Sequence, residues 1–283
     1  MKNIALLFMI AIGLYGCGSV PITGRQQLNL VSDSEVLSLS LQEYNSYIQT
    51  AKKSTNKTAE ALVEKVGRKI AGAVESYFKV TGQEALLSNY KWEFNLVEEP
   101  QVNAFCMPGG KIVVYTGILP YTQDETGLAV VLGHEVGHAI AKHANERMSQ
   151  QIALGYGETA IGAALGKSSA TVQSIGSIVY GLGTKVGVTL PFNRKQELEA
   201  DHLGLVLMAI AGYDPNAAIP FWERMSQQGG SALELLSTHP SDNTRIAEIR
   251  KELPDAMEYY NAIWGNGAPV SAPSGSSKGD WHF

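Results

Sequence analysis

Apolar residues recur at helical spacing in three long stretches of the chain. The first helix is expected from the capping box Ser32–Glu35 to about residue 52, and the second from 58 to 79. The third begins at the capping box Thr122–Glu125, with Thr122 as the N-cap, and runs to about Gln150. The apolar stripes of these helices are Leu37, Leu41, Tyr44 and Ile48; Leu62, Val66, Ile70, Val74 and Phe78; and Leu128, Val131, Leu132, Val136 and Ile140.

Between the second and third helices the pattern changes to that of β-strands. Lys91–Val97 alternates polar and apolar residues, as a strand with one buried face does. Val102–Met107 and Lys111–Thr116 are two further strand-like runs, joined by a tight turn at Pro108–Gly110. The expected fold is therefore α+β: predominantly helical, with a small sheet whose edge borders the third helix. Such an edge can take up an extended peptide by strand addition.

The third helix contains the pattern H-E-x-x-H. Residues four apart lie on the same face of a helix, so His134 and His138 can bind one Zn²⁺, with Glu135 beside them as general base for the metal-bound water. Gly133 and Gly137 each cost this helix about 1 kcal/mol relative to Ala, which makes sense if something approaches this face closely. The alternative is an amphipathic helix with two incidental histidines.

A catalytic zinc needs a third protein ligand and an open position for water. A fourth helix is expected through Glu197 to Ala211, and Glu197 and Asp201 share one of its faces. Glu197 can complete a His-His-Glu site, while Asp201 can accept a hydrogen bond from the second nitrogen of a ligand histidine. Ala200 and Gly204 leave room beside them. Without the histidine motif, a solvated charged face would be the simpler interpretation; with it, the metal site is favoured.

The N-terminus has the features of a bacterial lipoprotein signal peptide. A short apolar run ends in Leu14–Cys17, which resembles a lipobox, where the peptide is cut before a cysteine that is then lipidated. Cys17 is the expected lipidation site, and an ordinary signal peptide that ends near a cysteine is the alternative. The expected order is a signal peptide at 1–16, a lipidated tether at 17–31, a zinc-binding domain at 32–264 and a disordered tail at 265–283.

The composition sets further limits. At 283 residues and 45% hydrophobic content, the chain can bury the core of one large domain or two small ones. The net charge of −5 and the lack of a basic block make nucleic acid an unexpected partner. The Gly-, Ala- and Ser-rich segment 155–187 is interpreted as close helix packing or a mobile lid, with an intramembrane hairpin as the alternative. Cys106, the one thiol left after lipidation, is expected to be buried in a strand.

Several motifs together resemble one enzyme family. They are Asn103–Gly110, the H-E-x-x-H helix, Glu197–Asp201, Ser237–Pro240 and Arg245-Ile246, in the family's order over about residues 33–253. The chain resembles the gluzincin endopeptidases, which include the CAAX prenyl protease, the HtpX heat-shock protease and periplasmic or mitochondrial quality-control relatives. The resemblance implies zinc on His134, His138 and Glu197, with Glu135 catalytic. The family's membrane enzymes carry transmembrane helices; none is predicted here, so the soluble or lipoprotein branch is expected.

Two further residues receive roles from the resemblance. In relatives the histidine at the position of His239 lies near the metal, where it can cover the metal or help to hold the oxyanion; a histidine that anchors its loop is the alternative. Arg245 is a candidate for ordering the site or stabilising charge there. His143 and His202 are predicted to be surface or packing residues, and His282 falls in the expected disordered tail.

The function expected from these features is hydrolysis of peptide bonds by a zinc endopeptidase with one Zn²⁺ per chain. Strand addition reads backbone rather than side chains, so the expected substrates are extended or misfolded proteins of the cell envelope. The expected location is the bacterial periplasm, lipid-anchored to a membrane, with the outer membrane favoured by Gly18 after the cysteine. The alternative is a lipid-anchored chaperone or assembly factor with structural or latched zinc. His239 as a fourth ligand would favour that alternative, because a closed site leaves no place for water.

Overall fold

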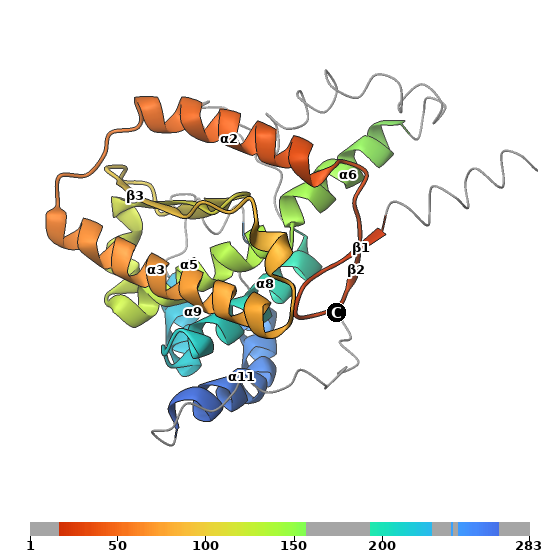
Figure 1. Ribbon diagram of the computed structural model, residues 1–283. Helices are drawn as coiled ribbons and strands as arrows, with labels where there is room; N and C mark the ends of the chain where they lie inside the picture. The colour runs from red at the N-terminus through yellow and green to blue at the C-terminus, as the bar shows by residue number, and fades with distance from the viewer. Residues whose placement is uncertain (1–16, 157–192, 228–238, 240–242, 266–283) are drawn as a thin grey trace, which may run out of the picture.

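A small sheet in the computed structural model is covered by helices on both faces (Figure 1). Helix α2, Asp33–Thr50, lies over one face, and helices α3, Lys57–Val80, and α5, Glu125–Ile140, lie over the other. The structure describes residues 17–156, 193–227, 239 and 243–265. The expected signal peptide, most of the Gly-, Ala- and Ser-rich segment, and nearly all of the expected tail with His282 lie outside the described residues.

The sheet has the strand order β3-β5-β4. Its strands span Glu93–Val97 (β3), Ala104–Met107 (β4) and Lys111–Tyr115 (β5); β5 runs parallel to β3 and antiparallel to β4. The turn between β4 and β5 requires glycine, because Gly109 and Gly110 have φ angles of 87° and 80°. Strand β4 is the edge that contacts α5. The predicted α+β fold, mostly helical with a small sheet beside the H-E-x-x-H helix, is confirmed.

The central strand β5 is buried on both faces and separates two hydrophobic clusters. Ile112 and Val114 belong to the larger cluster, with α3 and α5, whereas Val113 and Tyr115 belong to a smaller cluster with α2. This alternation follows from the two-residue period of a strand. The larger cluster continues beyond α5 into the C-terminal helices, so α5 lies in the interior of the protein.

The first helix begins as predicted, and the third does not. Ser32 caps α2, where its side chain accepts a hydrogen bond from the N–H of Glu35. The N-cap of α5 is Asp124, which accepts from the N–H of Gly127 at 2.8 Å. Thr122, the predicted N-cap, ends the short helix α4, Leu119–Thr122, and its hydroxyl donates to the carbonyl of Leu119. Thr122 and Asp124 can both cap a helix. Because Thr122 belongs to α4, Asp124 is the residue that caps α5.

The third helix also ends earlier than predicted. Helix α5 stops at Ile140, and a separate helix α6, His143–Tyr156, follows it. The break lies at Lys142, whose φ of 56° is in the left-handed region. Since no glycine or proline marks this position, the hydrophobic pattern runs across it without interruption. The break turns the start of α6 back toward the face of α5 that carries the histidines.

Helix α8, Arg194–Ile210, crosses α5 at very short distance. It opens with a capping box between Asn193 and Gln196. A Cβ added to Gly137 would lie 2.8 Å from the carbonyl oxygen of Ala200, and one added to Gly204 would lie 2.8 Å from the backbone nitrogen of His134. The close approach inferred from the glycines is therefore that of α8, as the small residues on α8 also suggest.

The remaining elements lie beyond α8 or are short. Helix α9, Ala218–Gln227, and helix α11, Asn243–Trp264, pack on each other, and α11 packs on α8 (Figure 1). Three 3₁₀ turns complete the described elements of this part of the fold: η1, Glu84–Leu87; η2, Thr116–Ile118; and η3, Pro215–Ala217.

The residues before α2 pack on the domain. Cys17–Ser19 (β1) and Gln26–Leu28 (β2) form an antiparallel hairpin, and Val20 is part of the larger hydrophobic cluster. The segment expected as a tether at 17–31 buries apolar side chains in this way, and it also buries the side chain of Thr23. This segment is short and mixes polar and apolar residues without a regular period. Its sequence therefore does not predict the contact with the domain.

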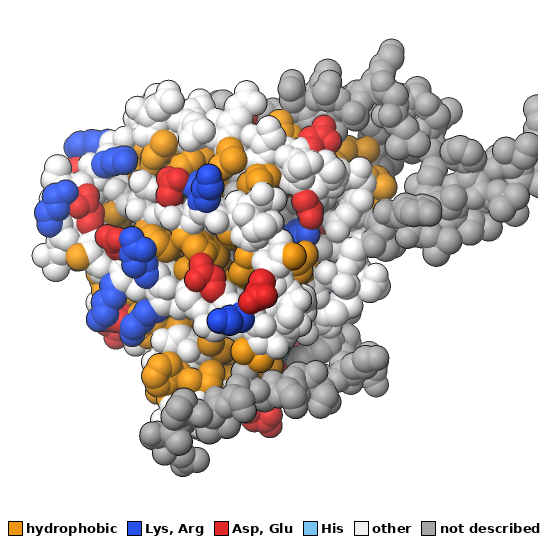
Figure 2. Space-filling view, viewed as in Figure 1, with side chains coloured by type: hydrophobic (Ala, Val, Ile, Leu, Met, Phe, Trp, Pro, Cys, Tyr) orange, Lys and Arg blue, Asp and Glu red, His pale blue; other side chains and the backbone are white. Residues whose placement is uncertain are grey.

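The face shown in Figure 2 carries acidic and basic side chains in alternation. Arg68 and Glu64 on α3 form one exposed ion pair of the described residues. Within the described ranges, none of the helices combines the length and the apolar character that crossing a membrane requires.

Candidate metal centre

Four buried side chains converge on one point. His134 and His138 project from α5, Glu197 from the first turn of α8, and His239 precedes α11. Each offers one ligand atom, and these atoms all lie within 4.8 Å of one another. The structure thus brings together the three zinc ligands predicted from the sequence and adds His239 to them.

The separations of the ligand atoms fit a tetrahedral zinc ion. His134 Nε2 lies 3.1 Å from His138 Nε2 and 3.5 Å from Glu197 Oε2. His138 Nε2 lies 3.4 Å from Glu197 Oε1. His239 Nδ1 lies 3.2 Å from His134 Nε2 and 3.0 Å from Glu197 Oε1. Bonds of about 2.0–2.1 Å to a tetrahedral zinc separate the ligand atoms by about 3.3 Å, so this donor set fits one Zn²⁺.

A carboxylate orients the first histidine directly. Asp201 Oδ1 accepts a hydrogen bond from His134 Nδ1 at 2.8 Å, as predicted. Arg245 binds both oxygens of Asp201, at 2.6 and 2.7 Å, and stacks on Trp222 with its Cζ 3.6 Å from the ring centroid. Its third nitrogen lies 3.2 Å from Glu197 Oε2. Arg245 therefore contacts two carboxylates of the site, Asp201 and Glu197.

A histidine orients the second ligand. His138 Nδ1 lies 2.8 Å from His143 Nδ1, and His143 Nε2 lies 3.0 Å from Glu199 Oε2. Glu199 also accepts from the Thr23 hydroxyl at 2.5 Å and from Arg25 Nε at 2.6 Å, both in the N-terminal hairpin. Burial lowers the pKa of His138 well below its usual value and also lowers that of His143. Both shifts favour the neutral imidazole, the form in which a histidine binds a metal.

Glu135 lies beside the ligand cluster without joining it. It is buried, and its Oε1 makes no hydrogen bond to the described residues. His239 Nε2 lies 3.5 Å from Glu135 Oε1. Burial raises the pKa of Glu135, against the opposing influence of His239 and His134. An unpartnered buried carboxylate oxygen next to a metal cluster is suited to receive a proton from water.

Sequence reasoning missed the residues behind His138. His143 and His202 were expected at the surface or in packing; both are buried, His143 against His138 and His202 against Glu252 at 2.9 Å. Glu199 lies within the motif Glu197–Asp201, and the motif by itself indicates no role for it. The available signal was its position in a largely apolar helix, because a buried carboxylate needs partners. Nothing in the sequence pointed to the hairpin residues that bind it.

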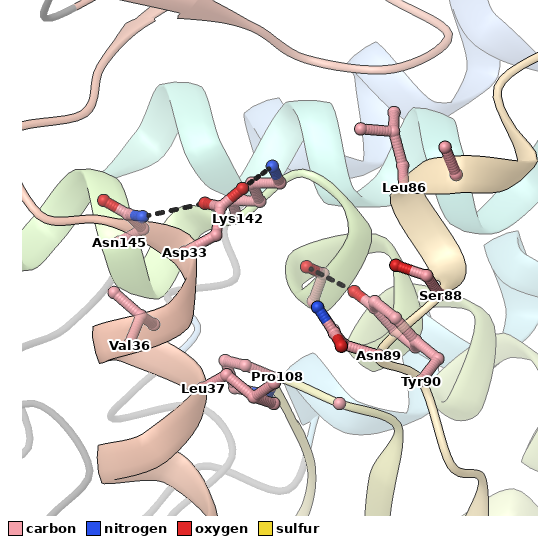
Figure 3. Close-up of a pocket in the computed structure, with 13 residues that line it drawn as sticks. Asp33, Val36, Leu37, Leu86, Ser88, Asn89, Tyr90, Pro108, Lys142 and Asn145 are labelled. Atoms are coloured by element: carbon pink, nitrogen blue, oxygen red, sulfur yellow. Dashed lines mark hydrogen bonds and ion pairs between the residues drawn. The ribbon is translucent and has the colours of Figure 1, made fainter.

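A cavity of about 150 Å³ lies where β4 and α5 end (Figure 3). Leu37 from α2 and Pro108 from the β4–β5 turn line one side, and Tyr90 lies opposite, donating to the carbonyl of Ala139 at 3.2 Å. Lys142 and Asp33, at the start of α2, form an ion pair on the rim of the cavity. The cavity therefore lies next to the β4–β5 turn, and none of the four ligand residues lines it.

Two histidines of an H-E-x-x-H helix, a glutamate from a second helix and a buried glutamate beside them define a zinc metallopeptidase centre. Comparison with protein families agrees with this class. Residues 68–253 match the model of Peptidase family M48, and the chain belongs to this family, whose members are zinc-dependent metallopeptidases. The prediction from the motifs is therefore confirmed at the level of Peptidase family M48.

Similar proteins occur in mitochondria and bacteria. The chain is 42% identical over 187 residues to the mitochondrial metalloendopeptidase OMA1 of Schizosaccharomyces pombe, covering 63% of this chain and 53% of that protein. It is 31% identical over 271 residues to OMA1 of Saccharomyces cerevisiae, covering 92% and 76%. It is 32% identical over 166 residues to the beta-barrel assembly-enhancing protease of Yersinia pestis, covering 56% and 34%. The chain thus spans about half the length of the first of these relatives and a third of the last.

Proposed function

We propose that this chain is a zinc-dependent endopeptidase, and the position of Glu135 is the observation that carries the proposal. His134, His138 and Glu197 would hold the ion. When bound, zinc supplies the Lewis acidity that activates water and polarises a peptide carbonyl. Glu135, buried with an Oε1 that makes no hydrogen bond to the described residues, accepts the proton of the attacking water and returns it to the leaving amine.

The outer edge of β4 is the proposed binding site for an extended substrate. The carbonyl of Asn103 accepts from the N–H of Tyr115 on β5, so the alternation of an antiparallel pair directs the backbone groups of Ala104 and Cys106 outward. A chain paired there leads at Pro108 toward the cavity of Figure 3. Because such pairing uses backbone groups, it selects unfolded segments over particular sequences. Extended or misfolded proteins are therefore the proposed substrates.

The proposed location follows from the N-terminal sequence. The lipobox-like run ending at Cys17 supports cleavage and lipidation there, which would place the domain on a membrane facing the bacterial periplasm, with the outer membrane favoured by Gly18. The hairpin β1–β2 would then lie directly beside the anchor. The proposed substrates are accordingly proteins of the cell envelope.

The substitution Glu135→Gln tests the proposed function. It keeps the shape of the side chain and removes its proton-accepting capacity, so we expect zinc content to stay at one ion per chain while cleavage of casein falls by about 10²–10⁴-fold. Zinc is measured by atomic absorption and cleavage by release of labelled fragments. The exposed Glu223 provides the control, because Glu223→Gln should change neither quantity. Cleavage by the Glu135→Gln variant at the wild-type rate would contradict the assignment of Glu135 as the general base.

A second function is favoured by one specific observation, the position of His239. Its Nδ1 occupies the fourth position of the ligand cluster, and its Nε2 faces Glu135. A zinc ion with four protein ligands has no place for water, so this arrangement is that of a closed site. It suits an endopeptidase in a latched state, and it also suits a lipid-anchored chaperone or assembly factor that rarely cleaves. We favour the latched endopeptidase, because an assembly factor would not need Glu135 buried beside the metal.

The substitution His239→Ala separates these two functions. For the latched enzyme we expect weaker zinc binding together with faster cleavage of casein, since the fourth position becomes free for water. A loss of cleavage with zinc retained would instead assign His239 to the oxyanion. If neither wild-type protein nor the variant cleaves, while both prevent aggregation of an unfolded protein, the assembly function is supported in place of the protease.

A further inference from the structure

A continuous set of buried polar side chains connects the ligand His138 to the N-terminal hairpin. The contacts run from His138 to His143, from His143 to Glu199, and from Glu199 to Thr23 and Arg25. Each hydrogen bond in the chain is between 2.5 and 3.0 Å long. His143 and Glu199 have side chains that are 0% exposed. None of these contacts is explained by the catalytic roles assigned above.

The direction of every hydrogen bond follows once the metal is placed. A metal on His138 Nε2 leaves the hydrogen on Nδ1, so His138 donates and His143 Nδ1 accepts. The hydrogen of His143 then resides on Nε2, which donates to Glu199 Oε2. Glu199 can only accept, and it receives the two further donors from Thr23 and Arg25. Donors and acceptors match at each step, which fixes both tautomers for metal binding.

The arginine at the end of this chain is itself held firmly. Arg25 NH1 and NH2 donate to the two oxygens of Glu146 at 2.8 Å each. Glu146 receives a third hydrogen bond from Gln196 Nε2, at the start of α8. The guanidinium thus joins α6 and α8 behind His138, and the hairpin supplies a positive charge that pairs with both Glu146 and Glu199.

We propose that His143 is the positioning residue for the zinc ligand His138, and that Thr23 and Arg25 make the N-terminal hairpin part of the zinc centre. This inference rests on the zinc site of the proposed function. It gives the segment next to the lipidation site a share in metal affinity, because displacing the hairpin removes two of the three donors that hold Glu199. His143 touches no reacting atom in this arrangement and acts through His138.

The test measures zinc affinity of the full chain by competition with a fluorescent chelator, together with the visible absorption of the Co²⁺-loaded protein. The substitution His143→Leu should weaken zinc binding by roughly 10–100-fold and change the Co²⁺ bands, as loss of a hydrogen bond to a ligand histidine does. His143→Gln should stay near wild type, since an amide can accept from His138 and donate to Glu199. The zinc affinity of Arg25→Gln should lie between that of the wild type and that of His143→Leu.

Two controls separate positioning from stability. His202 is a second buried histidine bonded to a carboxylate, and His202→Leu should lower thermal stability without changing zinc affinity or the Co²⁺ spectrum. Arg250, in an exposed pair, is the control for Arg25. If His143→Leu does not fold, the difference between Arg25→Gln and Arg250→Gln carries the test.

Wild-type zinc affinity and an unchanged Co²⁺ spectrum in both His143→Leu and Arg25→Gln would overturn the inference while leaving the proposed protease intact. A wild-type chain that binds no zinc would overturn both. Tight zinc binding without casein cleavage by either the wild-type chain or the His239→Ala variant would contradict the proposed function alone, because affinity and the Co²⁺ spectrum can still be compared among the variants.

Discussion

The two ligand histidines sit one helical turn apart, yet the protein holds them by different means. His134 donates directly to the carboxylate of Asp201, on the same helix that supplies Glu197. His138 is held by another histidine, His143, and only the next residue in line is a carboxylate. The first support comes from helices α8, α9 and α11, and the second from α6, α8 and the N-terminal hairpin. The zinc centre therefore depends on both ends of the described chain.

The two supports also differ in how their buried charges are balanced. Arg245 faces Asp201 and Glu197, but Glu197 is also a proposed metal ligand, so Asp201, which is shared with His134, is the one of these two carboxylates that binds no metal. Arg25 is shared by Glu146 and Glu199, and neither of these binds the metal. Loss of one carboxylate on the Arg25 side leaves the other in place. The His134 side is therefore expected to be the more sensitive of the two.

The largest expected effect tests this asymmetry. In excess zinc, Asp201→Asn should lower the free energy of unfolding by about 3–5 kcal/mol, because it breaks a buried ion pair and leaves Arg245 without the one of its two carboxylates that binds no metal. Glu199→Gln should cost less, roughly 1.5–3 kcal/mol, since Arg25 keeps Glu146. Urea denaturation measures both. Equal losses in the two variants would refute the asymmetry.

An exposed pair provides the reference for that comparison. Glu223 bonds Arg250 at 2.8 Å, with side chains that are 44% and 58% exposed. Exposed pairs of this kind are typically worth about 0–1 kcal/mol. Glu223→Gln should therefore change urea stability by less than either buried substitution. This control shows whether burial, rather than loss of a negative charge as such, sets the cost.

The asymmetry also explains what the sequence could and could not predict. The His134 support was predictable, because Glu197 and Asp201 lie four apart on one helix and share a face. The His138 support was not, because it depends on the left-handed residue Lys142, which ends α5 and turns His143 back toward His138. A helix continued to Gln150 would carry that histidine along a different face.

Long-range contacts account for the other differences. Thr23 and Glu199 are 176 residues apart, and no local pattern links them. Asp124 and Thr122 are both good capping residues, so the start of α5 was decided by the neighbouring turn α4. The sheet and α2 and α3 were predictable because their apolar periodicity is local and strong. The metal centre could be predicted where it follows helical spacing, and not where it follows tertiary contact.

Both supports depend on the close crossing of α5 and α8, which a smaller substitution can test. Gly137→Ala places a Cβ 2.8 Å from the carbonyl of Ala200, between the residues that hold the two histidines. We expect a loss of about 1–3 kcal/mol from this overpacking. Gly72→Ala on α3 is the matched control, since its Cβ would meet nothing within 4 Å, and it should gain about 0.4–1 kcal/mol. Both changes are read from urea denaturation with and without zinc.

The effect of Gly137→Ala on zinc binding shows how the supports of His134 and His138 are coupled. Separation of α5 from α8 moves Asp201 away from His134 and Glu199 away from His143 together, so Gly137→Ala should weaken zinc binding as well as stability. If only stability falls, the side chains that hold His134 and His138 move with the backbone and keep their contacts, and the two supports adjust independently. If neither falls, the crossing distance does not constrain the centre, and the glycines of α5 would need another explanation than the approach of α8.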